Sequence, residues 1–502
     1  MRCRAMRTWA AEQTARPVRI MLQAACLVLP LGGCWITGKP PEPGLDIAAA
    51  YSAGPKKAAV ADAATPKLDW WRSFRSRELT DILDNASVAN LDIAAAVARI
   101  VQADAQSRIT GAALLPAVDL NGSATHLRTS QSTTAGGTSG SLGGSERDAL
   151  SASLTASYEI DFWGKNRFAL RAQEETAIAS RYDRDVVALS TLVTAANSYF
   201  QVLAAQDRLR VAQQNLVSAK RVAALIGERQ KAGTASGLEV AQQQSVVDTI
   251  NASIPPLQQT VAQYRNALAV LMARSPESVH VRGGSLNAIA IPRVTPGLPS
   301  ELLARRPDIR EAEAQLAAAN ANVANARAQF LPSITLTGEG GYQSAILKTL
   351  LRPESAFFTL TAGLTQPIFE GGRLLGNLDQ QKGRQDELLQ DYRKAVISGF
   401  SDVETALTNV RQTALRERLQ RAVVASSRQA FDISEQRLRE GTIDLVTVLQ
   451  TQQTLYSAQD TLVLARLAHI QAIVSLYQAL GGGWSPKPLD YHACTANCPS
   501  RS

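Results

Sequence analysis

Residues that carry enzyme chemistry are scarce and scattered in this chain. Its 502 residues include four histidines, His126, His280, His469 and His492, and they lie far outside the short spacing typical of metal ligands. No glycine-rich phosphate-binding loop follows a predicted strand. We therefore predict that the chain is not an enzyme and that it holds no metal ion and no catalytic cofactor.

Aromatic residues are also few, at 5% of the chain, and the mean hydropathy is −0.08. Such a chain has little bulk for a thick globular core, although its Ala, Gln, Leu and Val content suits long helices. About half of the net charge of +8 comes from arginines that precede residue 34. No stripe of Lys and Arg with interleaved aromatics occurs elsewhere, which argues against nucleic-acid binding.

The N-terminus has the pattern of a bacterial export signal. Basic residues end at Arg19, and the apolar stretch over 20–31 is shorter than the ~20 residues of a membrane-spanning helix. It ends in Leu31-Gly32-Gly33-Cys34, which resembles the lipobox of bacterial lipoproteins. The resemblance implies a signal peptide over 1–33 and a lipid on Cys34; the alternative is a plain secretory signal. We predict a lipid-anchored linker over 34–67.

Two further cysteines, Cys494 and Cys498, lie in a polar C-terminal tail predicted over 485–502. In an oxidising periplasm this pair suits a disulfide. Free thiols, or a metal site with His492, are the alternatives that the sequence leaves open.

The sequence repeats itself across its two halves. Two pairs of landmarks recur: Leu91-Asp92-Ile93 with Pro307-Asp308-Ile309, and Gly233-Thr234 with Gly441-Thr442. The offsets are 216 and 208 residues, far longer than solenoid repeats of about 20–50 residues, and indicate one duplication of a structural half. We predict a first structural repeat over 68–299 and a second over 300–484.

Each half is predicted to contain a helix, two strands, a very long helix and a second helix. The first helices are expected over Ser76–Ala113 and Glu301–Phe330. The long helices are expected over Asn166–Lys231 and Leu374–Glu440, and the first of these, with 66 proline-free residues, would extend about 100 Å if straight. An apolar stripe of that length needs parallel neighbouring helices to bury it.

Strict alternation of apolar and polar residues marks the strands. It runs over thirteen residues from Leu150 to Phe162 and recurs over 118–124, 333–337 and 358–365. Short segments with one apolar face and one Ser/Thr face are typical of transmembrane β-barrels, and the alternative is a soluble sheet. Gly- and Ser-rich loops that suit the cell exterior are expected at Leu127–Ala149 and Gly340–Ala356. Four strands cannot close a barrel, so the chain must oligomerise if it spans a membrane.

Several motifs occur in a fixed order along the chain. They are Trp70-Trp71-Arg72-Ser73-Phe74, Asp161-Phe162-Trp163-Gly164, Leu302-Leu303-Ala304-Arg305-Arg306-Pro307-Asp308-Ile309-Arg310, Phe330-Leu331-Pro332, Gln366-Pro367-Ile368-Phe369-Glu370-Gly371-Gly372-Arg373 and Ala479-Leu480-Gly481-Gly482-Gly483-Trp484. Together with the duplication, this set resembles the outer membrane factors, the TolC-like family, in its lipoprotein branch typified by OprM and NodT. The paired Trp70 and Trp71 are expected to pack as anchors.

The resemblance implies an α+β membrane protein. In this fold three copies form a homotrimer, with a twelve-stranded transmembrane β-barrel continuous with a long periplasmic α-helical barrel, and each chain supplies four strands plus the long helices. It implies the outer-membrane exit duct of a tripartite efflux or export system. The expected partners are a periplasmic adaptor protein, an inner-membrane pump of the RND class and the outer-membrane lipid.

The resemblance also implies where adaptor contact and gating occur. The turns at Gly233-Thr234 and Gly441-Thr442 would contact the adaptor and form the periplasmic entrance. Asp444, with Arg437 and Arg439, would form the gate, where three carboxylates in a trimer attract cations. Related chains carry the acidic residue one place earlier, where this chain has Ile443, so a solvated surface aspartate is the alternative.

Three other functions fit parts of the pattern. A type I-like secretion channel shares the duct architecture. A passive diffusion channel explains the strands but not the long helices, whereas a periplasmic coiled-coil scaffold explains the helices but not the alternating strands. The transported substrate is not encoded in any recognisable motif.

Overall fold

The computed structural model describes residues 44–45, 51–52, 68–128, 146–294 and 299–484. These residues form two compact units. The first unit contains Val101–Ile178 and Glu313–Asp391, and the second contains the described parts of Gly44–Ile100, Ala179–Ala312 and Tyr392–Ser502. The predicted lipid site Cys34 and the pair Cys494 and Cys498 lie outside the described residues.

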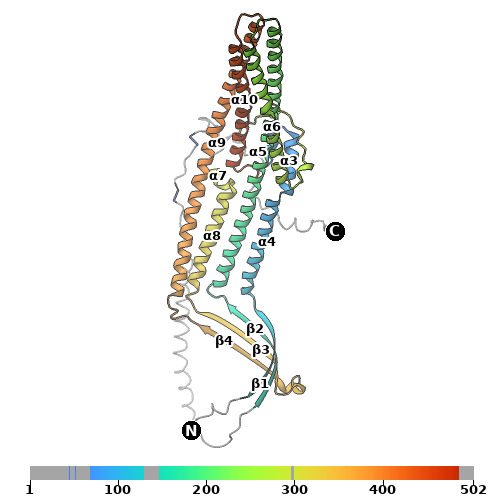
Figure 1. Cartoon of the computed structure of the whole chain (residues 1–502). Helices are drawn as coiled ribbons and strands as arrows, with labels where there is room; N and C mark the ends of the chain where they lie inside the picture. Colours follow the sequence, from blue (N-terminus) through green and yellow to red (C-terminus); the bar gives the residue numbers. More distant parts are fainter. Residues whose placement is uncertain (1–43, 46–50, 53–67, 129–145, 295–298, 485–502) are drawn as a thin grey trace, which may run out of the picture. The chain divides into compact units, whose positions relative to one another are not determined.

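The first unit is built around a four-stranded antiparallel sheet with the order β1-β2-β3-β4 (Figure 1). The strands are β1 Ala117–Arg128, β2 Glu146–Ile160, β3 Ser333–Ser344 and β4 Ala356–Thr365. β2 of the first half pairs directly with β3 of the second half, and Leu154 lies opposite Gly340 in that pairing. The two hairpins therefore form one continuous sheet whose outer strands are β1 and β4.

Both predicted loops are shorter than expected because the strands extend into them. β1 and β2 continue to Arg128 and from Glu146, where His126 and Asp148 lie opposite each other with 2.6 Å between Nδ1 and Oδ1. β3 continues through Gly341, where a Cβ would lie 2.2 Å from the carbonyl oxygen of Ala152. That glycine permits a close approach of two strands, and its presence does not mark a loop.

The longer helices of the two halves correspond in order (Figure 1), and their lengths agree closely. α4 and α8 have 21 and 22 residues, α5 and α9 have 67 each, and α6 and α10 have 35 each. Their bounds are α4 Leu91–Gly111, α5 Lys165–Lys231, α6 Gly237–Leu271, α8 Pro307–Ala328, α9 Arg373–Arg439 and α10 Leu445–Ala479. The shorter elements include η1 Trp70–Phe74, α3 Arg77–Ala89, η5 Leu286–Ala288, α7 Pro299–Arg305, η6 Leu347–Thr349 and η7 Pro353–Ser355.

The two continuous first helices predicted from the sequence were wrong, because each is interrupted. α3 ends before Asn90, whose side-chain oxygen accepts hydrogen bonds from the backbone N–H groups of Asp92 and Ile93, at 2.9 and 3.1 Å. This N-cap starts α4 as a separate helix. In the second half, Arg306 separates α7 from α8 because Pro307 disfavours helical conformation at the preceding residue.

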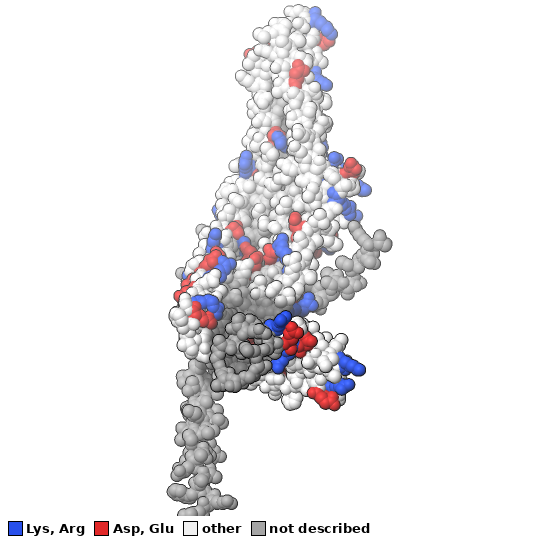
Figure 2. Space-filling view, turned by 60° about the horizontal axis from the view of Figure 1, so that its bottom comes forward, with Lys and Arg blue, Asp and Glu red and all other residues white. Residues whose placement is uncertain are grey.

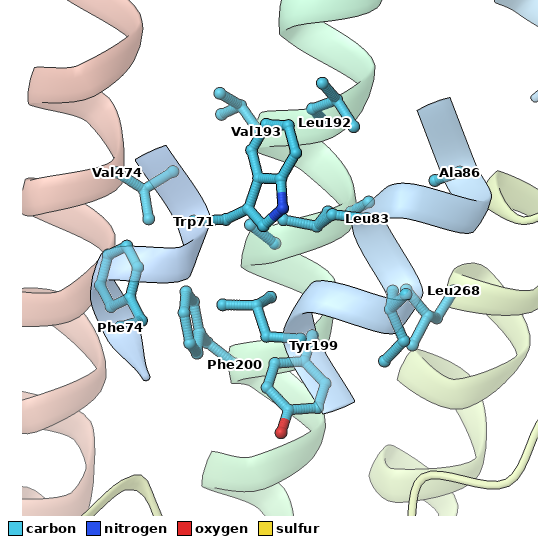
Figure 3. Packing of buried hydrophobic residues seen from close by; sticks show 14 of the residues in the cluster. Trp71, Phe74, Leu83, Ala86, Leu192, Val193, Tyr199, Phe200, Leu268 and Val474 are labelled. Carbon is cyan, nitrogen blue, oxygen red and sulfur yellow. The ribbon is translucent and has the colours of Figure 1, made fainter. Parts of the chain in front are cut away.

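The aromatic anchors lie in the largest apolar core, within the second unit (Figure 3). Trp70 is 1% exposed and stacks on Tyr477 of α10, with 5.2 Å between ring centroids. Phe74 contacts Phe200 of α5 at 5.3 Å between centroids. The prediction that Trp70 and Trp71 act as packing anchors is confirmed.

Three helical stretches are long and apolar enough to cross a membrane by length and composition alone: Arg77–Leu114, Lys165–Lys231 and Leu445–Ala479. In the second and third, 61% and 56% of the most apolar window is buried inside the chain. Their apolar residues contribute to the core that holds Trp70, so packing between helices accounts for much of this hydrophobicity.

Candidate functional site

The candidate site is the end of the second unit where α5 turns into α6 and α9 turns into α10 (Figure 1). Both turns have the same backbone. Gly233 and Gly441 have φ of 74° and 73°, the left-handed region in which glycine is favoured. The N–H of Thr234 donates to the carbonyl of Arg229 at 2.8 Å, and that of Thr442 donates to the carbonyl of Arg437 at 2.9 Å. Both long helices therefore end in a Schellman motif.

Each outgoing helix begins with a side-chain cap. Ser236 and Glu239 form a capping box at the start of α6. At the start of α10, Asp444 accepts hydrogen bonds from Thr447, at 2.9 Å from the backbone N–H and 2.6 Å from the hydroxyl. The two hydrogen bonds from Thr447 lower the pKa of Asp444, which is exposed and therefore carries a negative charge at neutral pH.

A charged cluster joins α5 to α9 near the turns. The guanidinium of Arg221 on α5 donates two hydrogen bonds to Glu435 on α9, at 2.8 and 2.7 Å. Arg439, one helical turn further along α9, donates to the same carboxylate at 2.6 Å. Burial alone would raise the pKa of Glu435, but these hydrogen bonds outweigh it and hold that pKa below its usual range. The buried carboxylate is thus ionised and neutralised by two arginines.

A third arginine joins the end of α9 to the turn after α5. Arg229, near the end of α5, donates to the carbonyl of Leu438 on α9 at 3.0 Å and to the carbonyl of Thr234 at 3.5 Å. Its side chain therefore holds the last turn of α9 beside the first of the two turns. The carbonyl of Leu438 also accepts a hydrogen bond from the N–H of Gly441 at 3.1 Å, so Arg229 is its second donor.

A small apolar core lies behind these charges. It consists of Val222, Ile226, Phe431, Leu438, Leu445, Val448, Leu455 and Tyr456. The hydroxyl of Tyr456 donates to the carbonyl of Asn215 at 3.0 Å, and burial raises the pKa of Tyr456 to about 12. Beside it, Arg208 on α5 and Asp460 on α10 form a two-pronged ion pair at 2.6 and 3.2 Å, which lines a groove of about 510 Å³.

The outward surface of the turns is partly apolar. Leu238 on α6 is 67% exposed and Val446 on α10 is 49% exposed. They stand at equivalent positions, each five residues after the glycine of its turn. Each turn is therefore followed by one exposed aliphatic side chain, an arrangement that suits contact with another protein.

The gate residues predicted from the sequence, Asp444, Arg437 and Arg439, do not form one cluster in the structure. Arg439 is joined to the charged cluster through Glu435, whereas Arg437 is exposed and shares no ion pair with any described residue. Asp444 caps α10 at the exposed turn. The sequence analysis missed Arg221 and Glu435. The spacing of Glu435 and Arg439, four residues apart on a helix, was a readable signal, but nothing in the sequence connects Arg221 to them.

Charges elsewhere are dispersed. On the face that Figure 2 shows, acidic and basic side chains lie in small mixed groups, and no patch of one sign covers it. Within the described ranges, no group of three or more His, Cys, Asp or Glu side chains is placed to hold a metal ion.

The sequence profile of the family described as outer membrane efflux protein matches residues 82–274 and 298–482. The chain belongs to this family. Among outer membrane efflux proteins, it is 40% identical to the pyoverdine export outer membrane protein OpmQ of Pseudomonas aeruginosa, over 93% of this chain and 97% of OpmQ. It is 31% identical to the probable efflux pump outer membrane protein TtgC of Pseudomonas putida, over 92% of this chain and 96% of TtgC.

Solved structures agree with this assignment. The outer-membrane channel OprN superposes with a TM-score of 0.83 and 25% identity, over 90% of this chain and all of OprN. The resemblance to the TolC-like outer membrane factors is confirmed. The protein is an outer membrane component of an efflux system, located in the outer membrane with a periplasmic extension.

Proposed function

We propose that three copies of this chain assemble into the exit duct of a tripartite pump, closed around a twelve-stranded β-barrel. The observation that carries this proposal is the pair of open edges of the sheet. β1 and β4 each pair with one neighbour only, so their outer backbone groups have no partner strand among the described residues. In lipid such groups must be paired, and the β1 edge of one copy can pair with the β4 edge of the next.

The faces of the sheet support the same arrangement. The register places on one face a set of exposed apolar residues: Val118, Leu120, Leu154, Leu336, Phe358, Leu360 and Leu364. Leu120, Phe358 and Leu360 are 80%, 87% and 82% exposed, an arrangement that water disfavours and lipid favours. The opposite face carries Asn121, Ser153, Thr155 and Thr337, which suit a water-filled lumen.

The partners and the gate are assigned to the turns. Gly233, Thr234, Gly441 and Thr442, with exposed Leu238 and Val446, would contact a periplasmic adaptor that links the duct to an inner-membrane pump of the RND class. Asp444, Arg437 and Arg439 would form the gate of the periplasmic entrance. These side chains are charged and exposed, and a trimer would bring three sets of them together at the entrance, which supports this role. Substrates would pass without chemical change.

Two further assignments complete the proposal. Cys34 would carry the lipid that holds the N-terminus to the inner leaflet of the outer membrane, and Cys34→Ala should lose the lipid while the barrel still inserts. Residues 68–299 and 300–484 would be the two structural repeats. The equal lengths of α5 and α9, at 67 residues, support that division.

Cysteine cross-linking tests the trimer directly. In a background with Cys494→Ser and Cys498→Ser, Gly122→Cys on β1 is combined in turn with Phe358→Cys, Leu360→Cys and Ala362→Cys on β4. All four positions lie on the apolar face by register, so one combination should give covalent trimers and nothing larger. The pair Gly122→Cys with Thr359→Cys points to opposite faces and is the matched control. A ladder that stops at dimers, or continues past trimers, would contradict the proposal.

A second candidate concerns the substrate. The two OpmQ proteins, of Pseudomonas aeruginosa and Pseudomonas putida, are each 40% identical to this chain and are named for pyoverdine export. We propose pyoverdine or a chemically similar secreted molecule as the cargo. Expression of this chain in a Pseudomonas aeruginosa strain without OpmQ should restore pyoverdine in the medium. Normal assembly in the outer membrane without restored export would reject this substrate and leave the duct proposal intact.

A further inference from the structure

The loop between β3 and β4 is an ordered structure built around Thr349. The hydroxyl of Ser344, at the end of β3, lies 2.7 Å from that of Thr349 and accepts a hydrogen bond from the N–H of Ile346 at 3.2 Å. Ser355, just before β4, donates to the carbonyl of Thr349 at 2.9 Å. The loop lies at the end of the strands opposite to the helices of the first unit, so in a duct it faces the cell exterior.

The register shows to which side the loop folds. Ser344 lies opposite Leu150, and Tyr342 and Leu336 precede it at even spacing on β3. Side chains two residues apart share a face of a strand, so Ser344 points to the apolar face of the sheet. The hydroxyl of Ser344 contacts that of Thr349, so we infer that the turn η6 lies on the apolar side of the sheet. In the proposed barrel this side faces the lipid, and the opposite side faces the lumen.

This loop exposes three large aliphatic side chains. Ile346, Leu347 and Leu351 are 63%, 73% and 77% exposed. Thr349 is hydrogen-bonded to Ser344 before the turn and to Ser355 after it. These bonds fix the turn, so the three aliphatic side chains are exposed in the folded loop. An ordered apolar patch next to a strand surface that faces lipid indicates that the same hydrophobic partner covers both.

Two cations flank this patch. Lys348 and Arg352 are exposed, and neither forms an ion pair with any described residue; Glu354 is the one acidic residue of the loop. By contrast, the basic side chains at the same end of β1 have acidic partners, because His126 lies 2.6 Å from Asp148 and Arg128 lies 3.5 Å from Glu146. The loop therefore combines aliphatic side chains with unmatched positive charge, the complement of an anionic lipid.

We propose that the β3–β4 loop binds lipid A in the outer leaflet. Ile346, Leu347 and Leu351 contact its acyl chains, and Lys348 and Arg352 bind its phosphates. This inference rests on the proposed barrel, since the loop meets the outer leaflet only if the strands span the membrane.

A fluorescent probe tests where the loop lies. Full-length protein with Cys494→Ser and Cys498→Ser carries one added cysteine, Leu347→Cys, labelled with a polarity-sensitive dye. The protein is inserted in phosphatidylethanolamine vesicles that contain lipid A and nitroxide-labelled lipid. Leu360→Cys on the apolar face and Thr361→Cys on the opposite face are the controls, and the unsubstituted background measures stray labelling. Quenching at positions 347 and 360, but not at 361, supports the proposal.

The controls separate the two ways to fail. Quenching at position 360 without quenching at 347 overturns the lipid-binding loop and leaves the barrel intact. Absence of quenching at position 360 overturns the barrel itself, and the loop proposal with it.

A titration tests the phosphate contacts. Lipid A is added to the probe-labelled protein in neutral detergent, and the half-saturating concentration is read from the dye at position 347. Replacing both cations, Lys348→Gln with Arg352→Gln, should raise that concentration by about thirtyfold, since each cation near an anionic lipid contributes about 1 kcal/mol. Arg128→Gln, which removes a matched cation at the same end of the sheet, should change it little. An unchanged midpoint in the double variant overturns the phosphate contacts.

Discussion

Ala273 and Gly481 occupy the same position after two equivalent helices, and both have left-handed backbone, with φ of 51° and 69°. After α6, the N–H of Arg274 donates to the carbonyl of Ala269 at 3.0 Å; after α10, the N–H of Gly482 donates to the carbonyl of Tyr477 at 2.8 Å. Both helices thus end in the Schellman geometry that also ends α5 and α9. At this position one half of the chain has glycine and the other has alanine.

Exchanging glycine and alanine at these two positions should change the stability in opposite directions. Ala273→Gly should stabilise the fold by about 0.5–1 kcal/mol, because a Cβ is unfavourable in the left-handed region. Gly481→Ala should destabilise it by more than that, since the new Cβ would lie 2.2 Å from the carbonyl oxygen of Arg305. Thermal loss of the helical circular dichroism signal measures both. Equal shifts of the same sign in the two variants would contradict the shared geometry.

The charged cluster at the turns predicts unequal effects of its two arginines. Arg221→Met should cost about 1–3 kcal/mol, because it removes a two-pronged hydrogen-bonded pair from buried Glu435. Arg439→Met should cost about 0.5 kcal/mol, because Arg439 makes one hydrogen bond to Glu435 from a half-exposed side chain four residues along the same helix. A double-mutant cycle with Glu435→Gln in urea unfolding gives each coupling energy.

Arg437→Met is the matched control for this cluster, because Arg437 is exposed on the same helix turn and has no ion pair with a described residue. Its coupling to Glu435→Gln should be near zero. If Arg437 couples to Glu435 as strongly as Arg221 does, the assignment of Arg221 as the main partner is wrong.

The sequence predicted well those elements whose side chains follow a short period, namely the strands and the long helices. The alternation from Leu150 onward corresponds to β2, and the proline-free stretches ended within one residue of α5 and α9. These signals are local, because side-chain period and helix breakers act over a few residues. The break at Asn90 was missed since the helical pattern continues on both sides, although asparagine is itself an N-cap signal.

The site was less predictable because its contacts join distant parts of the chain. The turns were found through the repeated Gly-Thr pairs. Arg221 and Glu435 are 214 residues apart, and only the fold brings them together. The β3–β4 loop was expected to be merely Gly- and Ser-rich, whereas its Ser344 and Thr349 organise an apolar surface.

Asp444 caps α10 and is also proposed to belong to the gate, and two substitutions separate these roles. Asp444→Asn keeps a side chain that can cap α10 but removes the charge, whereas Asp444→Ala removes both and should cost about 1 kcal/mol in helix stability. If the carboxylate belongs to the gate, both variants should weaken cation selectivity in planar bilayers to the same extent. A change in the alanine variant alone would show that Asp444 acts only as a cap.

Glu311 on α8 predicts a pH dependence of stability. Burial, reinforced by the nearby carboxylates of Asp183 and Asp308, raises the pKa of Glu311 to about 7. The folded protein therefore holds this proton more tightly than the unfolded chain, where the pKa is about 4.3. The stabilisation from the bound proton is complete below about pH 4 and is lost as the pH rises through about 7.

Glu311→Gln mimics the protonated side chain at every pH. Its melting temperature should equal that of the natural protein near pH 4 and exceed it near pH 8, with the difference growing between those values because the unfolded natural chain loses this proton at a lower pH than the folded protein does. Glu313→Gln, on the same helix with an exposed side chain, is the matched control and should give a smaller change between the two pH values. A difference for Glu311→Gln that is the same at both pH values would mean that the substitution acts through packing, and that folding does not raise the pKa of Glu311.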